Sequence, residues 1–263
     1  MNFLSPDSKH VVIGMLHLPP LPGSPLSRDS LNKICELMMA DAKALTDGGV
    51  DALMMENFGD VPFYPGRVPA HVVAMMTRVA LEVGRVSKLP LGINVLRNDG
   101  LSALSIAKAV DAKFIRVNVL TGARVTDQGL IQGIAHDLMR SRSDLCATDI
   151  KVMADIDVKH SAALAARLIE DEVEDAVKRG LADAIIVSGA GTGKPVNLEK
   201  LAAVARAAGK SPVVLGSGVS AENIKSLMPY AWGFIVGTSL KFDGDVAKPV
   251  DVARVKKLTA ACR

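Results

Sequence analysis

The sequence has 263 residues, of which 49% are hydrophobic, 22% charged and only 3% aromatic, so aliphatic side chains must fill most of its core. Its net charge of +3 arises from 31 basic and 28 acidic residues, which are scattered along the chain with few aromatic residues beside them. This distribution argues against a nucleic-acid partner. The chain also lacks an apolar run of about 18 residues, so we expect no transmembrane helix.

Cysteine usage suits a reducing compartment. Cys35, Cys146 and Cys262 are far apart and lack the spacing of metal ligands, which is typical of free thiols. Residues 1–10 contain no apolar core of the kind that a signal peptide needs. We therefore expect a globular cytoplasmic protein.

Apolar strand-like runs alternate with helical segments along the chain. The first predicted strand, residues 11–18, ends at His17 and enters a stiff loop with four prolines between residues 19 and 25. Asp29 or Ser30 is expected to cap a helix that ends at about Asp47. The other predicted strands cover residues 51–57, 89–96, 114–120, 149–160, 183–188, 212–215 and 233–236. The other predicted helices cover residues 70–87, 100–110, a segment ending near 143, 170–179, 198–208, 221–228 and 252–262, with a loop over 121–129.

The rhythm of these elements predicts the fold class. Alternating strands and helices with short connections indicate a parallel sheet. Eight such units in a chain of this length favour a single α/β domain, a closed (β/α)₈ TIM barrel over residues 1–263. An open doubly wound sheet is the alternative, but its glycine-rich fingerprint is absent after the first strand, where prolines follow instead.

The predicted strand over residues 149–160 carries charge in an otherwise apolar run. Because alternate strand residues point the same way, we expect Asp155, Asp157 and Lys159 to share one face, with His160 at the exit. Charges that simply point into water at a strand end are the alternative interpretation. Buried and unpaired, such groups would be strongly destabilising.

Polar residues gather where the predicted strands end, which is where barrel enzymes carry their active sites. Catalytic roles are predicted for His17, Glu56, Asp155, Asp157 and Lys159. Substrate-binding roles are predicted for Asn57, Asn94, Arg116, Asn118, His160 and Ser188. Arg97, Asn98 and Ser217 also lie at strand ends.

Two glycine-rich turns predict a phosphate site. Barrels often hold phosphate in the loops after their last two strands, and glycine allows the backbone N–H groups to approach an anion closely. The predicted phosphate-binding residues are Gly216, Ser217, Gly218, Gly237, Thr238 and Ser239. A further segment, Gly189-Ala-Gly-Thr-Gly-Lys194, lacks the full P-loop pattern because Pro195 follows the lysine, and it is interpreted as a loop contacting the same ligand.

The same rim leaves three chemical interpretations open. His17, Glu56, Asp155, Asp157 and His160 include suitable donors for a divalent metal ion. We favour a metal-free network in which Lys159 and Arg116 neutralise the carboxylates. Asp155 or Asp157 beside Lys159 would then serve in acid–base catalysis, whereas a Schiff base on Lys159 has no support in the sequence.

Taken together, several segments resemble the BtpA family, also called BtpA/SgcQ. The segments that carry the resemblance are residues 14–23 (GMLHLPPLPG), 51–57, 92–98 (GINVLRN), 114–118 (FIRVN), 126–129 (TDQG), 154–160 (ADIDVKH), 182–189 (ADAIIVSG), 216–219 (GSGV) and 234–241 (FIVGTSLK). The resemblance implies a barrel of the ribulose-phosphate-binding type. Cyanobacterial members are linked to photosystem I biogenesis and associate peripherally with membranes. The family supplies no agreed catalytic residues.

We therefore expect an enzyme that acts on a small phosphorylated metabolite, a sugar or nucleoside phosphate, by isomerase, lyase or hydrolase chemistry. The alternative is a non-catalytic accessory factor for a membrane complex. The expected partner is a phosphorylated small molecule. The family resemblance leaves peripheral membrane association open, and the sequence leaves a homo-oligomer open.

Overall fold

A computed structural model describes residues 10–189 and 197–263 of the chain. Within these residues, eight parallel strands close into a barrel in the order β1-β11-β10-β9-β7-β4-β3-β2. The barrel strands are β1 (Val11–His17), β2 (Ala52–Glu56), β3 (Leu91–Asn94), β4 (Phe114–Val117), β7 (Lys151–Ile156), β9 (Ala184–Val187), β10 (Val213–Leu215) and β11 (Gly233–Val236). The predicted (β/α)₈ barrel is confirmed.

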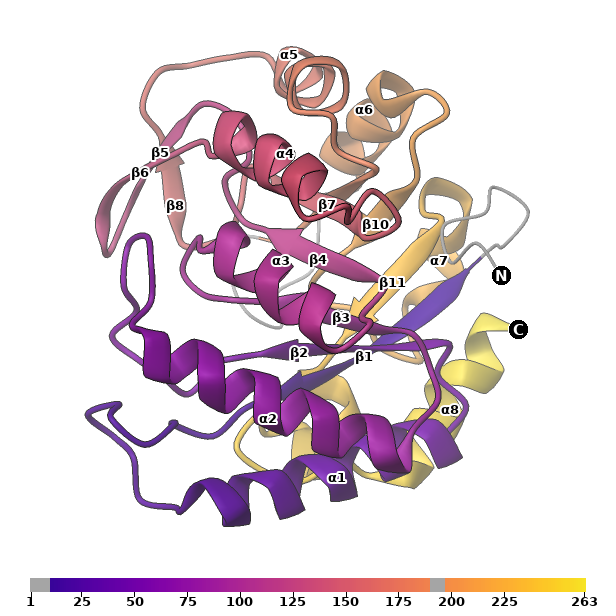
Figure 1. Cartoon of the computed structure of the whole chain (residues 1–263). Coiled ribbons are helices and arrows are strands. Elements are labelled where there is room, and N and C mark those ends of the chain that lie inside the picture. The colour runs from indigo at the N-terminus through magenta and orange to yellow at the C-terminus, as the bar shows by residue number, and fades with distance from the viewer. Residues whose placement is uncertain (1–9, 190–196) are drawn as a thin grey trace.

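Helices follow the strands and cover the outside of the barrel (Figure 1). They are α1 (Leu31–Asp47), α2 (Ala70–Val86), α3 (Gly100–Ala109), α4 (Ala135–Asp144), α5 (Ile169–Glu174), α6 (Leu198–Ala208), α7 (Ile224–Leu227) and α8 (Val252–Cys262). Helix α1 begins where the sequence predicts, because the Ser30 hydroxyl accepts a hydrogen bond from the Lys33 N–H. Helix α5 continues as a π-helical turn, Asp175–Arg179.

Two layers of aliphatic side chains hold the barrel together. One packs between the strands and the helices, and the other fills the barrel interior. Phe114 is the single phenylalanine of the interior layer and is fully buried. Its ring occupies the space beside Gly92, where an added Cβ would come within 2.1 Å of the Phe114 ring. The interior therefore accommodates the Phe114 ring because the neighbouring strand β3 has no side chain at that height.

A small antiparallel sheet, ordered β6-β5-β8, stands apart from the barrel (Figure 1). The sequence prediction of a loop over residues 121–129 is wrong here, because β5 (Ala123–Thr126) pairs with β6 (Gly129–Gln132) in a hairpin. Strand β8 (Ser161–Ala163) adds to the other edge of β5. The sheet is anchored through Arg124, whose side chain is buried.

The charged strand is shorter than the sequence predicts. Strand β7 ends at Ile156, and Asp157 and His160 have φ values of +51° and +56°. These left-handed conformations end the regular alternation of side chains. The prediction that Asp155, Asp157 and Lys159 share one strand face is therefore wrong.

Other boundaries shift by small amounts. The predicted helix over residues 221–228 narrows to α7 and a 3₁₀ turn, Met228–Tyr230. Residues 190–194 of the predicted ligand-contacting loop lie outside the described residues. Within the described ranges, no helix has both the length and the apolar character needed to cross a membrane.

Candidate functional site

A buried ion-pair network occupies the carboxyl end of the barrel. Arg116 on β4 donates from Nε to Asp155 Oδ2 at 2.8 Å and from Nη2 to Asp155 Oδ1 at 2.9 Å. Its Nη1 lies 3.9 Å from Glu56 Oε2. Burial disfavours the charge of Arg116, but Asp155 and Glu56 outweigh it and raise the pKa of the guanidinium above its ordinary value. The positive charge of Arg116 is thus permanent.

Neighbouring polar side chains complete the coordination of both carboxylates. Asp155 also accepts hydrogen bonds from Asn118 Nδ2 at 2.9 Å and from Ser188 Oγ at 3.2 Å. Glu56 accepts a hydrogen bond from Asn94 Nδ2. Asp155 therefore accepts four hydrogen bonds in all, and its carboxylate is held in one orientation from strands on both sides of β7.

His17, at the end of β1, stands beside this network. Burial is the main cause that lowers the pKa of its imidazole to about 4; Glu56 opposes this shift, and the nearby cations Lys241, Lys159 and Arg116 contribute to it. The buried Nδ1 has no hydrogen-bond partner among the residues that the structure describes. At neutral pH the ring is uncharged, so it can exchange a proton or a hydrogen bond with a bound molecule.

Lys159 supplies a second titratable group. Burial lowers the pKa of its ammonium below the ordinary lysine value, and the nearby Arg116 lowers it further, although Glu56 and Asp155 act in the opposite direction. In residues 10–189 and 197–263 no side chain pairs with this ammonium. A lysine in this state gives up its proton more readily than an exposed one.

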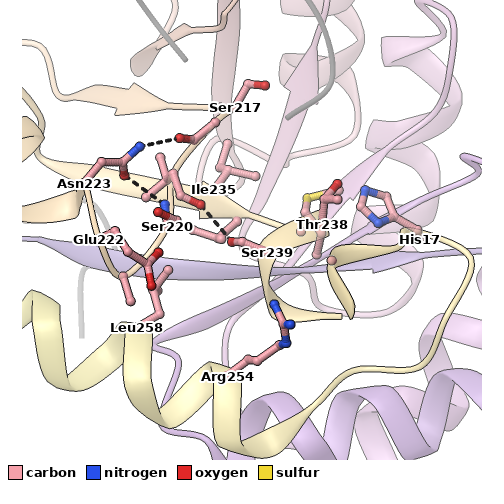
Figure 2. Close-up of a pocket in the computed structure, with 18 of the residues that line it drawn as sticks. His17, Ser217, Ser220, Glu222, Asn223, Ile235, Thr238, Ser239, Arg254 and Leu258 are labelled. Atoms are coloured by element: carbon pink, nitrogen blue, oxygen red, sulfur yellow. Dashed lines mark hydrogen bonds between the residues drawn. The ribbon is translucent and has the colours of Figure 1, made fainter. Parts of the chain in front are cut away.

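The two glycine-rich turns form one wall of a cavity of about 770 Å³. All six predicted phosphate-binding residues line it, and so do His17, Glu56, Arg116 and Lys159. Figure 2 shows the side chain of Thr238 next to His17. At Gly237 an added Cβ would lie 2.5 Å from His17 Cε1, so glycine allows the turn to approach the imidazole.

Hydrogen bonds fix these turns in place. Asn223 donates from Nδ2 to the Gly218 carbonyl at 2.7 Å and accepts from the Ser220 N–H at 2.9 Å. Ser239 Oγ donates to the Val219 carbonyl at 2.8 Å and thereby joins the two turns (Figure 2). The Ser239 hydroxyl therefore donates to the backbone, whereas the Thr238 side chain lies next to the imidazole (Figure 2).

Other predicted site residues serve the loops around the cavity. Asn57 accepts a hydrogen bond from the Leu96 N–H at 2.7 Å and donates to Asp60, and so it ties the exits of β2 and β3 together. Asp157 lies outside the network and pairs with Arg124 and Lys200, beside the small antiparallel sheet. His160 is exposed and lines a second cavity next to the first.

Among the described residues, the side chains that were candidates for metal binding do not come together. Glu56 and Asp155 flank Arg116, while Asp157 contacts other cations. In the described part of the chain, no three histidine, cysteine, aspartate or glutamate side chains lie close enough to hold a metal ion. The cation at the centre of this site is Arg116.

Several cavity residues have little signal in the sequence. Arg254, in the first turn of α8, directs its side chain toward the turns (Figure 2) and lines the cavity. Phe58 packs its ring 4.7 Å from the His17 ring, centroid to centroid. Buried Lys241 pairs with Asp41 on α1. Each lies in a loop or on a helix rather than at a strand end, where the sequence alone does not show which way a side chain points.

Comparison with known proteins extends this description. The family model described as the BtpA family matches residues 8–263. An uncharacterised protein of Thermococcus kodakarensis is 50% identical over 247 residues, which cover 94% of this chain and 93% of that protein. The photosystem I biogenesis protein BtpA of Synechocystis is 46% identical over 250 residues, covering 95% and 87%. An uncharacterised mitochondrial protein of Caenorhabditis elegans is 32% identical, covering 95% and 92%.

Solved structures resemble the fold. Phosphoribosyl anthranilate isomerase from Thermus thermophilus matches with a TM-score of 0.57 at 12% identity, covering 95% of this chain and 97% of that one. KGPDC from Streptococcus mutans matches with 0.59 at 9% identity, covering 97% of each. Tryptophan synthase from M. tuberculosis matches with 0.60 at 14% identity, covering 98% and 95%. At such low identities the likeness supports the barrel fold alone.

Proposed function

The chain belongs to the BtpA family, and from this premise we propose that it is an enzyme acting on a small phosphorylated metabolite by acid–base chemistry. The substrate phosphate would lie against the turns Gly216–Gly218 and Gly237–Ser239. The reacting part of the substrate would lie over His17, Glu56 and Lys159.

One observation carries this proposal. A single cavity is lined on one side by two glycine-rich turns and on another by a neutral histidine, a carboxylate and Lys159, which pairs with no side chain among the residues that the structure describes. Turns of this kind present backbone N–H groups to anions, and barrels commonly hold phosphate after their last two strands. The same cavity also contains groups that can transfer protons, so a bound phosphorylated molecule could react there.

The roles of the titratable groups follow from their environments. Lys159, with a lowered pKa, would take a proton from the substrate or return one. Neutral His17 would donate or accept a hydrogen bond at the oxygen where charge develops. Glu56 keeps its second carboxylate oxygen for the substrate, because the bonded Asn94 occupies only Oε2.

Asp155 suits a positioning role better than a catalytic one. Its four hydrogen bonds occupy both oxygens, so it has little capacity to accept a substrate proton. Its contribution would be to orient Arg116. Asp157 pairs with Arg124 and Lys200 outside the cavity. The catalytic roles that the sequence predicts for these two aspartates stay predictions.

A thermal-shift screen of phosphorylated metabolites tests the proposal, with inorganic phosphate as the simplest probe. A ligand at 100 times its dissociation constant adds about 2.7 kcal/mol of stability. For a domain of this size, that corresponds to a rise in Tm of about 5–10 °C. If neither inorganic phosphate nor any phosphorylated metabolite raises the Tm, the proposal is wrong.

Two variants make the screen specific. Thr238→Glu introduces a carboxylate next to the turns and should abolish stabilisation by phosphate through like-charge repulsion. Ser105→Glu adds the same charge on an exposed position of α3 and should leave the stabilisation unchanged. Equal effects of the two variants would indicate a nonspecific anion effect.

A second candidate function is an accessory role in the biogenesis of a membrane complex, since the Synechocystis relative is named a photosystem I biogenesis protein. One observation favours it. On the small sheet, Leu130 pairs with Val125, and Val125 pairs with Ala162, so three apolar side chains form a row that faces solvent. Replacing this row with polar residues distinguishes the two functions: metabolite binding should be unchanged, whereas an accessory role that depends on this surface should be lost.

A further inference from the structure

A second cavity of about 750 Å³ adjoins the first. Both cavities are lined by His17, Glu56, Arg116 and Lys159. The His17 imidazole lies at their junction, because it contacts the Gly237 turn of the first cavity and the Phe58 ring of the second. A molecule bound over these four residues would therefore extend into both spaces.

The walls of the second cavity are mainly apolar. They come from the loops after β1 and β2 and from the loop before α8, and include Leu26, Phe58, Val61, Phe63 and Val246. Leu26 and Val61 are 52% and 39% exposed. Large apolar side chains that face a concave space are typical of a surface that a ligand covers.

Some of the positive side chains around the second cavity form ion pairs, and others do not. Lys241 pairs with Asp41, and Lys248 pairs with Asp243. Arg97, by contrast, is 5% exposed, donates from Nη2 to the Lys159 carbonyl at 2.6 Å, and has a buried Nε without a partner in the described residues. Arg97 and Lys159, which form no ion pair with another side chain in the described part of the chain, thus lie near the junction, while the far walls are mainly apolar.

From this arrangement we infer that the substrate is an elongated phosphate monoester whose other end is an apolar, ring-sized group. The inference rests on the proposed function, since it places the phosphate in the first cavity. The polar centre of the substrate lies over the four shared residues and Arg97, and the apolar group occupies the second cavity. A simple sugar phosphate bound in the first cavity would leave the apolar walls of the second in contact with water.

A series of synthetic monophosphates tests the inference by calorimetric titration of the full chain. Each ω-phenylalkyl monophosphate is compared with the ω-hydroxyalkyl monophosphate of the same spacer length. Once the spacer reaches the second cavity, the phenyl compound should bind at least about tenfold more tightly, because aromatic rings bury large apolar areas. Compounds with shorter spacers should show no such preference.

A matched pair of double variants locates the ring. Leu26→Ser with Val61→Thr makes the second cavity polar and should reduce the phenyl preference at least about fivefold. The control is Leu130→Ser with Val125→Thr on the small sheet, whose residues are 51% and 45% exposed, and it should leave the preference unchanged. Melting curves of both variants check that they fold.

The outcomes separate this inference from the proposed function. If no monophosphate and no inorganic phosphate binds, the proposed function itself fails. If phosphate binds but the phenyl group adds nothing at any spacer length, the elongated substrate is ruled out while the phosphate site stands. A phenyl preference that both double variants reduce equally, or that neither reduces, places the ring outside the second cavity and overturns the inference.

Discussion

Replacing Asp155 by asparagine tests the buried network at its centre. The Asp155 carboxylate is fully buried, and the Arg116 side chain beside it is 3% exposed. The substitution keeps the shape of the side chain but removes the charge that balances Arg116. We expect Asp155→Asn to lower the free energy of unfolding by about 3–5 kcal/mol, which is the range for breaking a buried ion pair.

The hydrogen-bond pattern explains the size of this effect. Asparagine retains one acceptor oxygen, and the amide group that replaces the other oxygen faces donors. The least costly orientation puts the amide at the Oδ1 position, where the Ser188 hydroxyl can turn to accept. Arg116 Nη2 still loses its acceptor. A hydrogen bond to a charged group contributes about 1.5–3 kcal/mol, and the unbalanced charge adds to that loss.

Urea denaturation measures the effect, with Asp157→Asn as the matched control. Asp157 is 42% exposed, and its partner Arg124 retains Glu172, so we expect a loss of at most about 1 kcal/mol. With an m-value of about 3 kcal/mol/M, the urea midpoint of Asp155→Asn falls by about 1 M or more. Equal losses for the two variants would refute the reasoning that burial makes the Asp155 pair the costly one to break.

Three further predictions concern the same rim. The folded pKa of His17 is about 4, against an ordinary histidine value of 6.5. The unfolded chain therefore binds the extra proton between these pH values, and the free energy of unfolding falls by about 3 kcal/mol as the pH drops from 6.5 to 4. His17→Gln should remove that part of the pH dependence of urea denaturation, and an unchanged slope contradicts it. Gly237→Ala should displace the His17 imidazole and weaken phosphate binding about tenfold in calorimetric titration, while the circular dichroism spectrum stays unaltered. Gly66→Ala is the control, because an added Cβ at Gly66 would have no atom within 4 Å, and it should not weaken binding. Lys241→Met leaves buried Asp41 without its cation and should cost about 3–5 kcal/mol in the same denaturation assay; a loss below about 1 kcal/mol is inconsistent with a buried pair.

The barrel was predictable because its signal is repeated. The strands β1, β9 and β11 are short, mainly apolar and almost entirely buried, and helical segments separate them. Parallel strands covered on both faces have this composition. The hairpin of β5 and β6 was not predicted because its strands are short and each has a single buried residue, so they lack the apolar alternation that marks a strand.

The site was predictable as a location and less so as an arrangement. Strand ends brought His17, Glu56 and Arg116 together, since parallel strands end at a common rim. Asp157 was misplaced because a backbone turn with positive φ follows Ile156, and a side-chain period cannot be extended across such a turn. The pairing of Lys241 with Asp41 joins residues 200 positions apart, and nothing local in the sequence indicates that contact.

Because the Phe114 ring fills the space beside Gly92, we expect substitutions at positions 92 and 114 to depend on each other. An alanine at position 92 would put its methyl group within 2.1 Å of the ring, so that change is tolerated only after the ring has become smaller. A smaller residue at position 114 alone would leave a cavity in the interior layer. Both orders of change pass through a less stable intermediate, and we expect relatives to keep both residues or to have replaced both. Any redesign of the barrel interior must therefore treat the two positions as one choice.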